Sequence, residues 1–199
     1  MTMGVGPQAG AMGFYTIAGH VGGAINIGQA LLNDSCRFSH VFIVVYPIDH
    51  PDYPDGLIQE AMPGGMRVRP LTDRLGPGYA YAEFPREVSQ DAVRKVAQSF
   101  MPTLGGVSGR EVGPGYSFFS YPVLGLAQYR VTRWLTPGLE KLIDRSGDWI
   151  CSQHADEFWH RLGYQAFDDG RWRGDVTPGD LYYSTDSRVI RPAPRSVNG

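Results

Sequence analysis

One cysteine of this chain stands where a helix is expected to begin. Cys151 opens the stretch CSQHADEFWHRL, which follows a Gly-Asp turn, and the only other cysteine is Cys36. The N–H groups at a helix N-terminus favour negative charge, so they lower the pKa of a thiol there and favour the nucleophilic thiolate. The alternative is a buried cysteine that acts as a small apolar side chain. Position alone does not decide between the two.

A nucleophilic thiol needs a base, and His40 is the best placed of the five histidines. It stands where the polar letters RFS give way to the apolar VFIVV, at the mouth of a predicted buried strand. There the ring would have one end in the core and one at the surface, as a fixed general base requires. A half-buried histidine that merely begins a strand fits the same pattern.

The other histidines fit the role of base less well. His50 lies in a turn rich in proline and aspartate, and His20 lies among glycines. His154 is about one helical turn after Cys151, where a side chain points along the helix surface rather than across a cleft. A zinc site built on Cys151 and His154 lacks a second pair of ligands at a known spacing, so we expect no metal and no cofactor.

Glu60 is a candidate for orienting the base. It lies in LIQEAMP, an otherwise apolar segment that should pair with the His40 strand, although the sequence does not fix the register. A lone charge in such a place is costly unless it has a partner. The imidazole of His40 can be that partner, because a catalytic histidine donates its second N–H to an acceptor. Together, Cys151, His40 and Glu60 form the nucleophile, base and orienting group of a cysteine hydrolase.

The segments that must position these residues are predicted by their apolar periodicity and turn signals. A β-branched run at 39–47 and an apolar segment at 57–63 predict a strand hairpin with a long loop. A helix capped by Ser89 should end before Pro102. Other elements are expected as helices over 124–135, from 136 to about 145 and over 151–162, and as a turn followed by a strand over 176–184. Helices gathered around a few strands predict an α+β fold.

Length and composition are those of one globular domain. The chain has 199 residues, of which 42% are hydrophobic and 19% charged. We expect a flexible N-terminal arm over 1–13, one domain over 14–190 and an extended tail over 191–199. The formal charge of −2 gives no reason to expect a nucleic-acid partner.

The expected location is the cytoplasm, or a virion if a phage encodes the chain. No basic N-terminal region of a secretory signal is visible, and no apolar run approaches the length of a membrane span. The 16 arginines against two lysines suggest GC-rich coding, as in actinobacteria or their phages. Other common catalytic motifs are missing from the sequence, including G-x-S-x-G, the phosphate-binding G-x-x-x-x-G-K-[ST] and H-E-x-x-H.

The order of the motifs resembles the permuted papain-like cysteine hydrolases. These are circularly permuted relatives of the NlpC-type cell-wall peptidases, and lecithin–retinol acyltransferase-like proteins are related to them. The resemblance covers roughly residues 14–185 and is carried by SHVFIVV, IQEAMPGGMRVRPL, GPGYS, WICSQHADEF and TPGDL. In that group the strand histidine precedes the helix cysteine, as His40 precedes Cys151 here.

The resemblance implies roles for individual residues. It makes Cys151 the nucleophile, His40 the base and Glu60 the orienting group, and it places Tyr116 and Ser152 near the oxyanion or the substrate. It also implies a permuted papain-like fold, in which a small antiparallel sheet or partial barrel packs against helices and the nucleophile begins one of them. The sequence CSQHADEF departs from the commoner Cys-Ser-Glu-Leu-Val type, which leaves the orientation of the histidine in it open, toward the cleft or toward the surface.

The function implied by the resemblance is thiol acyl chemistry. We expect an amidase or peptidase that works through a thioester acyl-enzyme on a peptide, amide or lipid-ester substrate. The alternative is a phage or bacterial structural protein that keeps the fold without the catalysis. A catalytic Cys151 should be at least partly exposed, whereas Cys36 should titrate as an ordinary thiol.

Overall fold

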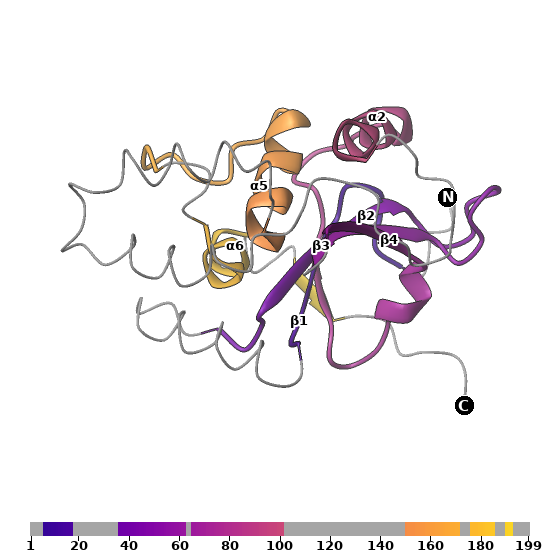
Figure 1. Cartoon of the computed structure of the whole chain (residues 1–199), viewed down its shortest axis with the longest axis horizontal. Helices are drawn as coiled ribbons and strands as arrows, with labels where there is room; N and C mark the ends of the chain where they lie inside the picture. The colour runs from indigo at the N-terminus through magenta and orange to yellow at the C-terminus, as the bar shows by residue number, and fades with distance from the viewer. Residues whose placement is uncertain are drawn as a thin grey trace.

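The computed structural model describes residues 6–17, 36–62, 65–101, 150–171, 176–185 and 190–192. Within these residues, six strands form one antiparallel sheet in the order β4-β3-β2-β1-β5-β6 (Figure 1). The strands are β1 Met12–Tyr15, β2 His40–Tyr46, β3 Leu57–Met62, β4 Gly65–Arg69, β5 Ala80–Ala82 and β6 Ile190–Pro192. The expected hairpin of β2 and β3 is confirmed.

Helices complete the described part of the chain and confirm the expected α+β class. They are the short 3-10 helix η1 Leu71–Arg74 and the α-helices α2 Gln90–Phe100, α5 Cys151–Arg161 and α6 Pro178–Ser184. The Ser89 hydroxyl accepts a hydrogen bond from the Ala92 N–H at 3.2 Å, so the predicted cap of α2 is present. The predicted helix at 151–162 is also confirmed as α5.

The two faces of the sheet bury different groups. Helices α2 and α5 lie against one face, while η1 lies against the other (Figure 1). Val41 and Ile43 of β2 belong to the larger core beneath the helices, whereas Phe42 packs with Leu71 of η1. Because side chains of a strand alternate between faces, His40 lies on the same face as Phe42. His40, the first residue of β2, therefore points toward the face that carries η1.

The segment TPGDLYYS, expected as a turn and a strand, is instead helix α6. The Thr177 hydroxyl accepts from the Asp180 N–H at 2.9 Å, and the Asp180 carboxylate accepts from the Thr177 N–H at 2.9 Å. This reciprocal pair is a capping box, and Pro178 stands at the first helical position, where its fixed φ suits a helix. These start signals outweigh the strand preference of Tyr182 and Tyr183.

Both expected ends of the domain need correction. Met12 and Gly13 lie in β1, which is hydrogen-bonded between β2 and β5, so a flexible arm over 1–13 is wrong in its last residues. Residues 190–192 form β6 at one edge of the sheet, so the expected tail over 191–199 begins with two strand residues. The edge position accounts for a proline in β6, because an edge strand does not need every N–H. The helices expected over 124–135 and from 136 to about 145 lie outside the described residues.

The close packing of β1 on β2 generates a prediction for Gly13. A Cβ placed on Gly13 would lie 2.2 Å from the Phe42 ring, and Phe42 is fully buried opposite it in the sheet. We expect Gly13→Ala to lower the free energy of unfolding by about 1–3 kcal/mol, because the ring has no free space into which to move. Urea denaturation measures the change.

Gly78→Ala is the matched control for this substitution. Gly78 is exposed, and no heavy atom lies within 4 Å of the position that its Cβ would occupy. The control should stay within about 0.5 kcal/mol of the wild type. Equal stability of Gly13→Ala and the wild type would contradict the packing described.

Candidate active site

His40 and Glu60 form a buried hydrogen bond across neighbouring strands. Nε2 of His40, the first residue of β2, lies 3.1 Å from Oε2 of Glu60 in β3, and both side chains are fully buried. An ionised carboxylate only accepts, so Nε2–H is the donor and Nδ1 is left to face another group. The partner predicted for the glutamate is therefore present.

Cys151 is the first residue of α5 and interacts with the same imidazole. Its thiol raises the pKa of His40 through charge and through hydrogen bonding. Among the described residues, His40 Nδ1 has no hydrogen bond of regular geometry. The Cys151 thiol thus lies close enough to the imidazole to change its pKa. The structure brings Cys151, His40 and Glu60 together.

The charges of these groups support one another. Burial alone lowers the pKa of His40, but the negative charges of Cys151 and Glu60 overcome that effect and raise the pKa to about 9. Burial alone raises the pKa of Glu60, but the hydrogen bond and charge of His40, followed by those of Arg74, lower it to about 2. Both shifts in pKa favour an imidazolium beside a carboxylate.

Two arginines approach the second oxygen of Glu60. Arg74 Nη2 lies 3.0 Å from Oε1, and Arg69 Nε lies 3.4 Å from the same atom. Neither arginine was predicted as a site residue. A buried carboxylate needs a positively charged or hydrogen-bonding partner, and this rule was the signal in the sequence. The spacing of the arginines in RVRPLTDR does not show which of them is that partner.

Tyr15, at the end of β1, was also not predicted. It pairs with His40 in the sheet register, and its ring contacts the imidazole edge-on with centroids 4.8 Å apart. The Arg74 guanidinium lies 4.7 Å from the centroid of the same ring. Burial, followed by the charge of Glu60, raises the pKa of Tyr15, so its phenol stays protonated at neutral pH. Unlike His40, Tyr15 is only partly buried.

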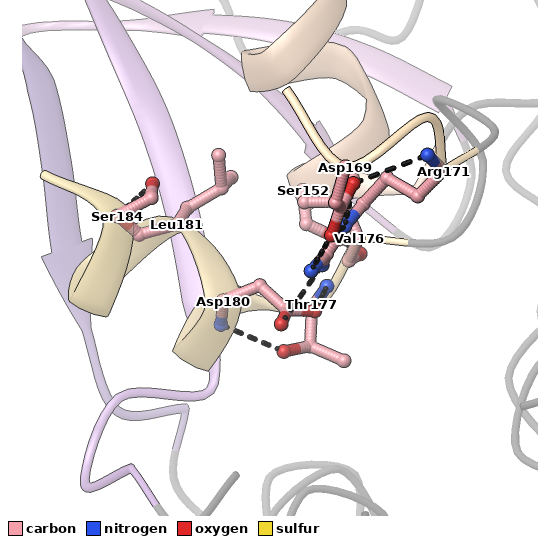
Figure 2. Close-up of polar contacts among 8 residues, drawn as sticks. All are labelled: Ser152, Asp169, Arg171, Val176, Thr177, Asp180, Leu181 and Ser184. Carbon is pink, nitrogen blue, oxygen red and sulfur yellow. Dashed lines mark hydrogen bonds and ion pairs between the residues drawn. The ribbon is translucent and has the colours of Figure 1, made fainter. Parts of the chain in front are cut away.

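The start of α5 is held by its contact with the segment before α6. The N-cap Ile150 has no polar side chain, and its own N–H donates to Gln153 Oε1 at 3.4 Å. The Ser152 hydroxyl donates to the Val176 carbonyl at 2.5 Å, next to the cap residue Thr177 (Figure 2). Because this bond uses the hydroxyl proton of Ser152, the residue does not offer that proton to an oxyanion in this arrangement.

An ion pair also ties the cap of α6 to the loop that follows α5. Arg171 Nη1 lies 3.0 Å from Asp180 Oδ1, and Arg171 also binds Asp169 (Figure 2). Asp180 therefore serves both the capping box and this ion pair. The TPGDL segment is therefore tied to the loop that follows α5.

His154 faces neither a cleft nor the surface, the two orientations considered from the sequence. Its side chain is fully buried, and Nε2 lies 3.1 Å from Gln59 Oε1. Gln59 in turn donates to the Ala97 carbonyl of α2 at 3.0 Å. Burial, followed by the positive charge of His40, lowers the pKa of His154 to about 3, so the ring is neutral. It links α5, β3 and α2 as a core residue.

The expected exposure of Cys151 is wrong. Cys151 and His40 are both 0% exposed, and α5 packs on β2, an interior strand of the sheet. Cys36 is partly exposed and forms no disulfide with Cys151. Tyr116 and His20 lie outside the described residues.

Comparison with known proteins leaves the site to be interpreted from its own chemistry. No protein-family model matches the chain, and no curated protein matches it. In the described ranges, no group of three or more His, Cys, Asp or Glu side chains is arranged to hold a metal ion. Nor does any helix in those ranges have the length and apolar character needed to cross a membrane.

The lowered pKa of Glu60 generates a prediction about stability and pH. Because the pKa falls from 4.5 to about 2 on folding, ionised Glu60 stabilises the fold fully above pH 4.5. That stabilisation is lost as the pH falls through about 2. We therefore expect the stability difference between wild type and Glu60→Gln to be largest above pH 4.5 and to shrink below it. Urea unfolding of both proteins at several pH values between 3 and 6 tests this, and a pH-independent difference would contradict it.

Proposed function

We propose that the protein is a cysteine-dependent hydrolase, an amidase or peptidase, with a permuted papain-like fold and the triad Cys151, His40 and Glu60. The observation that carries this proposal is the position of His40, which donates to Glu60 and interacts with the Cys151 thiol. The strand histidine also precedes the helix cysteine in the chain, which is the permuted order.

The electrostatics support a thiolate–imidazolium pair. The charge of Cys151 raises the pKa of His40, and the reciprocal effect is that a protonated His40 favours the Cys151 thiolate. The N-terminus of α5 adds partial positive charge at the same residue. A thiolate formed in this way is a nucleophile at neutral pH.

The proposed reaction then follows from these groups. The Cys151 thiolate attacks a substrate carbonyl carbon, and the backbone N–H of Cys151 stabilises the resulting oxyanion. The bond to the leaving amine or alcohol breaks, His40 donates its proton to that group, and a thioester remains. A water molecule then attacks the thioester while His40 accepts its proton, which releases a carboxylic acid and regenerates the pair. These steps use only protein groups and water, and they suit a peptide, amide or lipid-ester substrate.

The burial of the site favours a second candidate function. Cys151 and His40 are both fully buried, so hydrolysis requires the residues that cover the thiol to move. A structural protein that retains the fold without catalysis has no such requirement. The catalytic function requires the thiol to be ionised below the pH at which an ordinary thiol ionises, and it also requires the thiol to form an acyl-enzyme.

The pH profile of alkylation tests the thiolate despite this burial. Burial of the thiol slows alkylation by the same factor at every pH. Ionisation of the thiol instead changes how the alkylation rate depends on pH. We compare iodoacetamide labelling of Cys151 in Cys36→Ser with labelling of Cys36 in Cys151→Ala. Between pH 8 and pH 5, the Cys36 rate should fall by about 10-fold per pH unit, and the Cys151 rate should change by less than about 3-fold. Profiles of the same shape would contradict the proposal.

Acylation by p-nitrophenyl acetate tests the proposed roles. Cys151→Ala and His40→Ala should abolish acyl-enzyme formation at this site and turnover, because they remove the nucleophile and the base. Glu60→Gln should lower the rate by about 10- to 10⁴-fold, because it keeps the shape but loses the charge that stabilises the imidazolium. Glu60→Ala should lower the rate further, because the imidazole N–H also loses its hydrogen-bond acceptor. Mass spectrometry of Cys151 and nitrophenolate release measure both steps.

His160→Ala is the matched control for His40→Ala. His160 lies near the end of α5 and is only partly buried, so its removal should leave acylation at the wild-type rate. If Cys151 shows a thiolate profile but no variant or wild-type protein forms an acyl-enzyme, the non-catalytic function is favoured. Unchanged rates in both Glu60 variants would remove Glu60 from the triad.

A further inference from the structure

We infer that Arg74 is a positioning residue for the proposed hydrolase. Its guanidinium holds Glu60 in the orientation and charge state that keep His40 protonated, and it thereby sets how far into acid the Cys151 thiolate persists. The inference rests on the proposed function, but it concerns a residue outside the proposed triad.

The two oxygens of Glu60 have separate partners. Oε2 accepts from His40 at 3.1 Å, and Oε1 accepts from Arg74 at 3.0 Å. A carboxylate held at one oxygen by a fixed arginine cannot rotate without breaking a charge-assisted hydrogen bond. Arg74 therefore keeps the other oxygen directed at the imidazole.

Arg74 itself is held in place. Its side chain is 15% exposed, and it ends η1, whose Leu71 is fully buried. The Tyr81 hydroxyl donates to the Arg74 carbonyl at 2.7 Å. The Tyr15 ring, which also contacts His40, lies 4.7 Å from the guanidinium carbon. These contacts distinguish Arg74 from a surface arginine that meets a carboxylate by chance.

The signs of the charges alternate along the network. A Cys151 thiolate meets the His40 imidazolium, which meets the Glu60 carboxylate, which meets the Arg74 guanidinium. Burial alone raises the pKa of Glu60, and Arg74 is one of the groups that reverse this. Without Arg74 the carboxylate loses the hydrogen bond at Oε1 that fixes its orientation, so Oε2 stabilises the imidazolium less. The thiolate–imidazolium pair then gives way to the neutral pair.

Arg69 offers an internal comparison. It approaches the same Oε1 atom, but at 3.4 Å and from a side chain that is 36% exposed. Water screens the charge of a more exposed group, and a longer contact aligns less well. Arg69 should therefore contribute less than Arg74 to the charge of the site.

The experiment measures the pH profile of Cys151 alkylation by iodoacetamide in the Cys36→Ser protein. Arg74→Gln should lower the rate at pH 6, relative to the rate at pH 9, by about 10-fold, because the Glu60 carboxylate is no longer held toward the imidazole. The rate ratio of Arg74→Lys should lie between those of the parent protein and Arg74→Gln, because lysine keeps the charge but lacks the planar guanidinium donors. Arg69→Gln should have a smaller effect than Arg74→Gln. Arg94→Gln, which removes an arginine paired with Asp91 on α2, should leave the profile unchanged.

A second readout separates positioning from general stability. In a folded Cys151→Ala protein, NMR titration of the His40 ring should give a lower pKa when Arg74→Gln is added. Circular dichroism and thermal unfolding identify the folded variants, and Arg74→Lys serves in both readouts if Arg74→Gln does not fold. An unchanged alkylation profile together with an unchanged His40 pKa would overturn the role of Arg74.

The outcome also separates this inference from the proposed function. If the parent protein shows the profile of an ordinary thiol, the hydrolase proposal fails. The NMR titration still reports whether Arg74 controls the charge of His40 in that case. If the parent shows a thiolate profile, and Arg74→Gln leaves both that profile and the His40 pKa unchanged, only the inference fails.

Discussion

The buried carboxylate of Glu60 is the constraint on which the candidate site depends. A charge that is fully removed from water is costly unless it has charged and hydrogen-bonded partners. Here the partners are His40 and Arg74, one on each oxygen, with Arg69 beside the second. These partners lie in β2, η1 and β4, so the carboxylate of Glu60 joins three elements to β3.

The same constraint connects the sheet to α5, the helix that Cys151 begins. Glu60 raises the pKa of His40, and His40 is the group that interacts with Cys151 at the start of α5. The start of α5 is held in turn by the Ser152 bond to Val176 and by the neighbouring cap of α6. The polar residues on the opposite face have a different role. His154 and Gln59 are hydrogen-bonded to each other within the core, and His154 is neutral.

Local sequence signals predicted part of this arrangement. The β-branched run of β2, the apolar segment of β3 and the Ser89 cap of α2 each correspond to an element of the structure. The cost of a lone buried charge correctly indicated that Glu60 has a partner, and His40 is in contact with it. Each of these predictions succeeded because it depends only on a few neighbouring residues or on the cost of burying one side chain.

The features that the sequence did not predict depend on contacts between segments that are far apart in the chain. The strand β1 has a weak local signal, because its Gly13 suits the Phe42 ring opposite it rather than any strand preference. Arg74 and Tyr15 reach the site through the fold of η1 and the register of β1 on β2, which the sequence does not specify. The burial of Cys151, at the start of α5, likewise has no signal in the residues beside it in the sequence.

NMR titration of the His40 ring in the wild type and in Cys151→Ala tests most directly whether Cys151 and His40 form one ionised pair. We expect His40 to remain protonated through neutral pH and to titrate near 9 in the wild type. Its pKa should be lower in Cys151→Ala, because the thiolate that stabilises the imidazolium is gone. A His40 pKa near the ordinary 6.5 in both proteins would contradict the pairing.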